Sequence, residues 1–269
     1  MKKLTMTSLF AVVLSISIVG SSSAAFASPT SVNANAASNT TWTQSTKVVS
    51  GDEEIGELNT TYQYHRYLDN DGNQVADVVV KKDYELLPTA TEIQKQEFCD
   101  STNSYEIKVT KDQQFFVNGE KLTDEELNTP IVTSSTYDIV PFASQDTGGV
   151  PSVSHYYGDY TNYHLASYDD LNIMGGPQGR NHQANGKISN PYVTNAMSAI
   201  RSFSSNYSTM NLARTAFMTA AGLSVVTVAG IISAIAEGVA GVTAAITCYD
   251  AFQSCKHDLD QACNYIDRI

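Results

Sequence analysis

The sequence predicts an α+β fold, with a small antiparallel-sheet domain and short helices toward the N-terminus and an all-α apolar helical hairpin at the C-terminal end. Strand-like segments joined by short polar turns recur in residues 47–142, whereas residues 191–269 carry apolar side chains at helical spacing. Charge divides the chain in the same way. Residues 29–142 hold 8 basic and 19 acidic residues, and residues 143–269 hold 6 basic and 9 acidic residues. These contrasts predict a chain built from distinct parts.

The N-terminus is typical of a secretory signal peptide. Lys2 and Lys3 precede an apolar stretch from Leu9 to Val19, and Ala25-Phe26-Ala27 forms a cleavage site of the A-x-A type. A membrane anchor is the alternative, but the apolar stretch is shorter than the ~20 residues that a spanning helix needs. We therefore expect residues 1–27 to be a signal peptide and the mature protein to be secreted.

The region after the signal peptide divides into a flexible leader and an acidic α+β domain or pro-region. Residues 28–46 carry no charge and no periodicity, which predicts the leader. In residues 47–142, the polar stretch Asp69–Asn73 predicts a turn between two strands. A calcium loop is the alternative for this turn, but an apolar residue stands at its twelfth position, where an acidic ligand is needed. Two capping boxes, Thr89-x-x-Glu92 and Thr123-x-x-Glu126, each predict a short helix.

Residues 143–190 are rich in tyrosine and glycine and predict a loop region. Scattered histidines and aspartates in this region match no ligand spacing, so no metal site and no cofactor is expected. The residues considered for such a site are His155, His164, His182, Asp159, Asp169 and Asp170.

The apolar helical domain is expected over residues 191–269. Asn190 and Pro191 form a helix start, since asparagine caps helices and proline favours the first helical position. After a predicted break at Ser204–Thr209, the stretch Thr215–Ala236 has 22 residues without charge. As one helix it would extend about 33 Å, close to the thickness of a bilayer core. The candidates are a helix buried in a soluble core or oligomer, a permanent anchor, and a conditional membrane-inserting element, which we favour.

The apolar run resumes after the single charge of Glu237 and continues to Tyr249, and small residues within it are candidates for membrane insertion. Gly222, Gly230, Ala234 and Gly238 are spaced by four or eight residues, and small residues at this spacing let helices approach closely in lipid. Glu237 is costly in hydrocarbon, so we expect it at a bend, at the surface or protonated. Gly238 and Gly241 would supply the bend.

Four cysteines are candidates for disulfides in an exported protein: Cys99, Cys248, Cys255 and Cys263. If residues 248–266 form one helix, its cysteines lie about 10 Å or more apart along the axis, too far for a bridge within it. Either that helix bends back or at least two thiols stay free. The helix is amphipathic and suited to folding over the apolar run.

The layout resembles that of large secreted bacteriocins of the geobacillin type. The resemblance is carried by the Lys-Lys signal with Ala25-Phe26-Ala27, by the apolar tail from Ala221 to Ile246 and by the cysteine-bearing end from Cys248 to Cys263. It implies killing of related bacteria through their membrane and assigns no functional residue. The expected partners are the target bacterial membrane, an immunity protein in the producer and further copies of the chain.

Other function classes fit the sequence less well. The formal net charge of −12 argues against binding to nucleic acid. The nucleophile turns and metal-ligand patterns that mark many hydrolases are absent from the sequence, so we do not expect an enzyme. The alternative to a bacteriocin is an extracellular adhesion or coat protein without membrane activity, which would use the tyrosine-rich middle.

Overall fold

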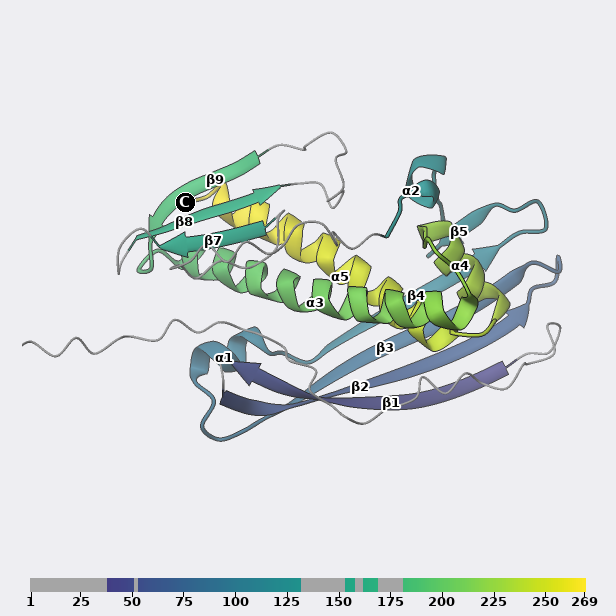
Figure 1. Cartoon of the computed structure of the whole chain (residues 1–269), viewed down its shortest axis with the longest axis horizontal. Coiled ribbons are helices and arrows are strands. Elements are labelled where there is room, and N and C mark those ends of the chain that lie inside the picture. The colour runs from purple at the N-terminus through teal and green to yellow at the C-terminus, as the bar shows by residue number, and fades with distance from the viewer. Residues whose placement is uncertain (1–37, 51–52, 132–152, 158–161, 169–180) are drawn as a thin grey trace, which may run out of the picture.

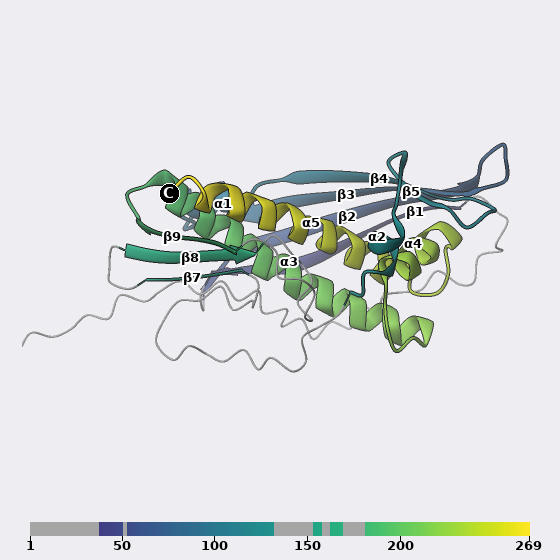
Figure 2. The same cartoon turned by 90° about the horizontal axis from the view of Figure 1, so that it is seen from above.

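The computed structural model describes residues 38–50, 53–131, 153–157, 162–168 and 181–269. The expected signal peptide, the first part of the expected leader and the stretch around residue 142 lie outside this range. The described chain is of mixed α and β structure, as the sequence predicts, with two antiparallel sheets and helices α3 and α5 along one face of the larger sheet (Figures 1 and 2).

The larger sheet has six strands that follow one another in sequence order, each antiparallel to the next. Successive side chains of each strand point to opposite faces of the sheet, so every second residue faces the helices. Trp42 pairs with Tyr62, which pairs with Val80, and these three side chains face the helices. The strands are β1 (Ser38–Ser50), β2 (Glu53–Leu68), β3 (Gln74–Leu86), β4 (Ser101–Val109), β5 (Phe115–Val117) and β6 (Glu120–Lys121).

Strand β1 corrects the expectation of a flexible leader over residues 28–46. Residues 38–46 belong to this strand, which pairs with β2 along its whole length. The segment is rich in threonine and serine and lacks the apolar alternation by which strands are usually recognised. Its backbone hydrogen bonds to β2, and the single inward tryptophan Trp42 stacks on Tyr62.

The region 143–190 is also more regular than expected, because it contributes a second sheet. Its three antiparallel strands are β7 (Val153–Tyr157), β8 (Asn162–Tyr168) and β9 (Asn181–Lys187). Strand β8 buries Leu165 against α3 and α5. Gly186 of β9 lies so close to Val193 of α3 that a Cβ atom there would come within 2.4 Å of its side chain. Leu165 and Gly186 therefore serve the packing of this sheet against the helices.

Local capping signals are largely confirmed. The box from Thr123 to Glu126 starts α2 (Asp124–Asn128) as predicted, with both of its hydrogen bonds formed. Helix α1 (Glu92–Glu97) begins two residues later than predicted, because Thr91 and Gln94 form its capping box. The turn Asp69–Asn73 joins β2 to β3, with Asp69 accepting hydrogen bonds from the backbone of the turn.

Three helices follow the second sheet: α3 (Pro191–Ala221), α4 (Val228–Glu237) and α5 (Val242–Ile266). Asn190 caps α3 with a hydrogen bond from the Tyr192 amide, as predicted. The predicted break at Ser204–Thr209 is wrong, because α3 continues through this stretch for 31 residues. The hydroxyl groups of Thr209 and Thr215 donate hydrogen bonds to the backbone carbonyl oxygens four residues earlier. These polar side chains are therefore compatible with the helix.

The sheet and the helices share one hydrophobic core. Tyr64 and Val78 of the sheet are buried in the same cluster as Ile232 of α4 and Ile246 of α5. A second cluster joins α3, α5 and β8 around Phe203 and Leu259. The predicted helical hairpin is therefore not a free-standing unit but part of the core that also holds the acidic part of the chain.

Candidate functional site

The uncharged stretch Thr215–Ala236 is not one helix, which corrects the prediction of a 22-residue span. Helix α3 ends at Gly222, which adopts a left-handed conformation with φ 67°. Helix α4 begins after Thr227, whose hydroxyl accepts a hydrogen bond from the Gly230 amide. The β-branched residues before Thr227 favour the extended connection. In the part of the chain that the structure describes, no helix has the length and hydropathy of a membrane span.

The proposed membrane-insertion residues have different roles in the fold. Gly222 and Gly238 end α3 and α4, because both hold left-handed backbone conformations that favour glycine. Ala234 is buried within α4. Gly230 does not mark a close helix approach, because a Cβ atom there would make only ordinary contact with the Thr227 hydroxyl, 3.6 Å away. The small-residue spacing in this stretch thus reflects helix ends more than helix packing.

Glu237 is exposed at the C-terminal end of α4, as expected for a charge at a bend. Two side chains of β2 bind the carbonyl groups of this helix end. The Tyr64 hydroxyl donates to the Ile235 carbonyl oxygen over 2.7 Å, and Arg66 Nη1 donates to the Glu237 carbonyl oxygen over 2.6 Å. A cation at a helix C-terminus also interacts favourably with the helix dipole. We call this contact, formed by Tyr64 and Arg66 on α4, the β2 clasp.

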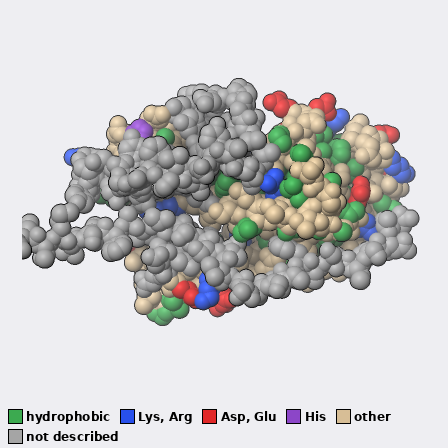
Figure 3. Space-filling model, in the orientation of Figure 1, with side chains coloured by type: hydrophobic (Ala, Val, Ile, Leu, Met, Phe, Trp, Pro, Cys, Tyr) green, Lys and Arg blue, Asp and Glu red, His purple; other side chains and the backbone are tan. Residues whose placement is uncertain are grey.

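Exposed aliphatic side chains gather at one end of the three helices. Leu223, Val225 and Val239 are 43%, 59% and 41% exposed. The turn that carries Val239 lies against the last turn of α3, because a Cβ atom on Gly241 would be 2.9 Å from the Ala220 Cβ. We call the segments 220–225 and 239–240 the apolar end; neither contains a charged residue. Figure 3 shows hydrophobic side chains gathered over α3 and α4 on this side.

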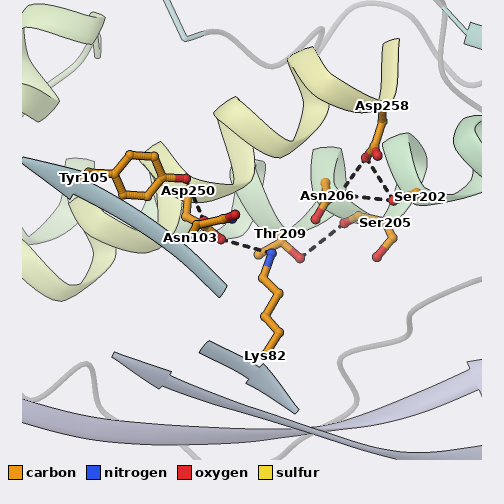
Figure 4. Close-up of polar contacts among 9 residues, drawn as sticks. All are labelled: Lys82, Asn103, Tyr105, Ser202, Ser205, Asn206, Thr209, Asp250 and Asp258. Carbon is orange, nitrogen blue, oxygen red and sulfur yellow. Dashed lines mark hydrogen bonds and ion pairs between the residues drawn. The ribbon is translucent and has the colours of Figure 1, made fainter. Parts of the chain in front are cut away.

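A polar cluster lies between the sheet and the helices, centred on the buried Asp250 of α5 (Figure 4). Its carboxylate accepts hydrogen bonds from Asn103 Nδ2 at 2.7 Å and the Tyr105 hydroxyl at 2.9 Å, and Lys82 Nζ lies 3.0 Å away. Three partners from β3 and β4 thus compensate one buried charge. Burial and the neighbouring Asp250 carboxylate raise the pKa of Tyr105, so its hydroxyl stays a donor. The cluster attaches α5 to the sheet.

A second carboxylate of α5, Asp258, attaches this helix to α3. Asp258 Oδ2 accepts hydrogen bonds from the Ser202 hydroxyl at 3.0 Å and from Asn206 Nδ2 at 2.7 Å. Burial raises the pKa of Asp258, although both hydrogen bonds, His257 and Lys82 act in the opposite direction. A cavity of about 440 Å³ beside Asp258 is lined by this carboxylate, by Lys82 and Asn103 of the sheet and by polar side chains of α3 and α5.

None of the four cysteines is in a disulfide. The sequence leaves two possibilities for residues 248–266, a helix that bends back or thiols that stay unbridged, and the structure has the second. Cys248, Cys255 and Cys263 are buried along the unbroken helix α5, and Cys99 is exposed beyond α1. The first two lie too far apart along the axis to be bridged. Burial raises the pKa of Cys248 to about 12 and also raises that of Cys255, as expected of thiols that fill an apolar face.

Of the residues considered for a metal site, the structure describes the side chains of His164 and His182 alone, and each has a partner of its own. His164 Nδ1 lies 2.9 Å from Asn185 Oδ1, and His182 Nδ1 lies 2.7 Å from Asp267 Oδ1. Asp159, Asp169 and Asp170 fall outside the described residues, as does the side chain of His155. Among the described residues, no group of three or more His, Cys, Asp or Glu side chains could hold a metal ion.

Comparison with known proteins does not place the chain in a family. No family model, no curated protein and no solved structure matches it.

Proposed function

We propose that the protein is a secreted antibacterial protein that acts on the membrane of related bacteria and that the apolar end makes the first contact with lipid. One observation carries the proposal. Leu223, Val225 and Val239 stand exposed together on segments without charge, at the end of the helices that contain the most apolar part of the chain. Grouped exposed apolar side chains commonly mark a contact surface.

The energetics of such a contact are favourable but modest. Full burial of a leucine or valine side chain contributes roughly 1.5 to 3 kcal/mol. Three side chains that are already about half covered gain less than three full burials. This is enough for reversible attachment and not for irreversible insertion. The apolar end is therefore the docking element of the proposal, and deeper insertion requires a second step.

The second step in this proposal is the release of α4 and α5 from the sheet. Helix α4 has 10 residues, about 15 Å, which is half of a bilayer core, so it has to join its neighbours in order to cross. Its buried side chains Ile231, Ile232 and Ile235 lie in the shared core and are the apolar surface that lipid would receive. The β2 clasp and the Asp250 cluster are the polar contacts that oppose this release.

Export supports the same proposal from the sequence. A basic start, an apolar stretch and Ala25-Phe26-Ala27 are the features of a signal peptide. A protein that attacks related membranes has to leave its producer, and the producer then needs protection. For this reason an immunity protein in the producer is part of the proposal. Self-association of the chain on the target membrane is a further part of it.

Dye release from lipid vesicles tests the proposal. The purified secreted chain is added to vesicles of phosphatidylethanolamine and phosphatidylglycerol that contain a self-quenching dye. We expect release by the wild-type chain and at least tenfold slower release by Leu223→Asp/Val225→Asp. The matched control is Leu87→Asp, since Leu87 is 44% exposed and follows β3 at the other end of the sheet.

Salt supplies a further readout in the same assay. The chain has a formal net charge of −12, so anionic lipid repels it, and salt screens this repulsion. Release should become faster as salt rises from 20 to 200 mM, opposite to the behaviour of a cationic toxin. Absence of release at every salt concentration, or equal release by the wild-type chain and the double variant, would contradict the proposal.

A further inference from the structure

A groove of about 880 Å³ lies between α5 and the segment that runs from β5 through α2 to Pro130. Its lining includes no residue of the apolar end and shares only Tyr105 with the Asp250 cluster. Its size falls within the range of known ligand-binding pockets. The composition of its floor and its rim indicates what kind of partner it fits.

The floor of the groove is apolar and aromatic. Leu122, Tyr249 and Phe252 line it, and each of these side chains also packs in the shared core. Tyr249 is buried, whereas Leu122 and Phe252 are only partly buried, so they present a face that the protein itself does not cover. An occupant with apolar side chains would cover this face and remove it from water.

The rim of the groove is acidic. Five carboxylates line it against the single ammonium group of Lys256. Glu126 is held by its capping box, and its hydrogen bonds from Thr123 lower the pKa of its carboxyl. The other four are exposed, and no ion pair within the described part of the chain neutralises them: Glu120, Asp124, Glu125 and Asp260.

The groove is elongated along α5. Its lining on this helix runs from Tyr249 to Asp260, which corresponds to about 16 Å of helix axis. Carboxylates stand on both sides, since Asp260 belongs to α5 and Asp124 and Glu125 belong to α2. Three turns of a helix, or about five extended residues, have this length.

We propose that this groove binds a basic amphipathic peptide segment of a partner protein, with apolar side chains on the floor and lysine or arginine side chains against the carboxylates. Charge complementarity of this kind raises the association rate and selects the partner, while the covered aromatic floor provides affinity. The proposal does not depend on the membrane activity above, because it concerns other residues and is tested without lipid.

Fluorescence anisotropy with a model peptide tests the groove on the full secreted chain. The probe is an 11-residue labelled peptide of leucine and lysine at amphipathic helical spacing, and its counterpart carries glutamate in place of lysine. We expect binding of the lysine peptide only, weakening at least tenfold between 20 and 200 mM salt because exposed charges are screened. Failure of the lysine peptide to bind at 20 mM salt would overturn the proposal.

Charge-matched variants locate the binding site. Glu120→Gln/Asp124→Asn/Glu125→Gln removes three carboxylates from the rim, and we expect it to weaken binding at least tenfold. The control is Glu57→Gln/Glu85→Gln/Glu106→Gln, which removes three carboxylates from the sheet face that points away from the helices. The control should bind within twofold of the wild type. Equal weakening of both triple variants, or no weakening of either, would overturn the proposal.

Discussion

Asp250 and Asp258 stand two turns apart on α5 and illustrate how residue-level surroundings decide the behaviour of a buried carboxylate. Asp250 has an ammonium group and two hydrogen-bond donors around it. Asp258 has two neutral donors within hydrogen-bond distance, and burial raises its pKa above the ordinary value of 3.8. The fold therefore shifts Asp258 toward its neutral form relative to the unfolded chain, while Asp250 is held by an ion pair.

The raised pKa of Asp258 has a definite sign for stability. A carboxyl whose folded-state pKa is raised contributes most below its unfolded value, and this contribution is lost as pH rises through the folded value. Asp258→Asn keeps an oxygen to accept from Ser202 and Asn206 and cannot ionise. We expect the free energy of unfolding of the wild type, measured with urea, to increase relative to that of Asp258→Asn when pH falls from 7 to 4. A constant difference between the two across this range would contradict the assignment.

At the residue scale, a feature can be predicted from sequence when it depends on a few neighbouring residues, as a helix cap does. The Asn190 cap and the box from Thr123 to Glu126 formed as predicted, because a capping side chain needs only the following three residues. The predicted box Thr89-x-x-Glu92 does not form, because Thr91, two residues later, caps α1 together with Gln94. The partners of Asp250 could not be predicted, because they come from strands about 150 residues earlier.

At the scale of elements, α4 is held by contacts that a sequence pattern does not reveal. The uncharged run predicted one long helix, whereas a left-handed Gly222 and the cap at Thr227 divide it. Thr227 before Val228 was the available signal, since threonine is a favoured cap. The β2 clasp could not be predicted, because Tyr64 and Arg66 lie 171 residues from the carbonyls that they bind.

The β2 clasp makes a prediction about the stability of α4. Tyr64→Phe removes one hydrogen bond and should lower the free energy of unfolding by about 0.5 to 1.5 kcal/mol, and Arg66→Met should lower it by about 1.5 to 3 kcal/mol. If release of α4 limits membrane attack, both variants should also release vesicle dye faster. The matched control is Tyr67→Phe on the opposite face of the same strand.

Urea unfolding and dye release together decide the role of the clasp. Tyr67→Phe should leave both measurements within error of the wild type. Destabilisation by Tyr64→Phe with slower dye release would mean that α4 is not released in the rate-limiting step. Unchanged stability would show that the clasp does not hold the helix.

At the scale of the whole molecule, one shared core unites parts that the sequence suggested were separate. Charge divides the chain at about residue 142, but Tyr64 of the acidic part and Ile232 of the neutral part are buried in the same cluster. The sequence could predict the class and the strands on both sides of the Asp69–Asn73 turn from local periodicity, but not β1 or the second sheet. It could not predict which apolar faces pair, since the partner of a face lies elsewhere in the chain.

The shared core sets a condition on the proposed membrane activity. The buried side of α4 packs on the sheet, and in the described part of the chain the exposed large apolar side chains lie at the apolar end and at scattered positions. In the proposal, docking through the apolar end requires no unfolding. Insertion of α4, in contrast, requires the shared core to open. A membrane-active protein built in this way should bind lipid before it changes structure.

An environment-sensitive fluorophore at the apolar end tests this account most directly. The variant Cys99→Ser/Leu223→Cys carries its only exposed thiol at position 223, because the three remaining native cysteines are buried. Its label should shift to shorter wavelength and brighten when vesicles are added, since it enters hydrocarbon. The same label in Cys99→Ser/Leu87→Cys should not change. No shift at position 223, or equal shifts at both positions, would contradict docking through the apolar end.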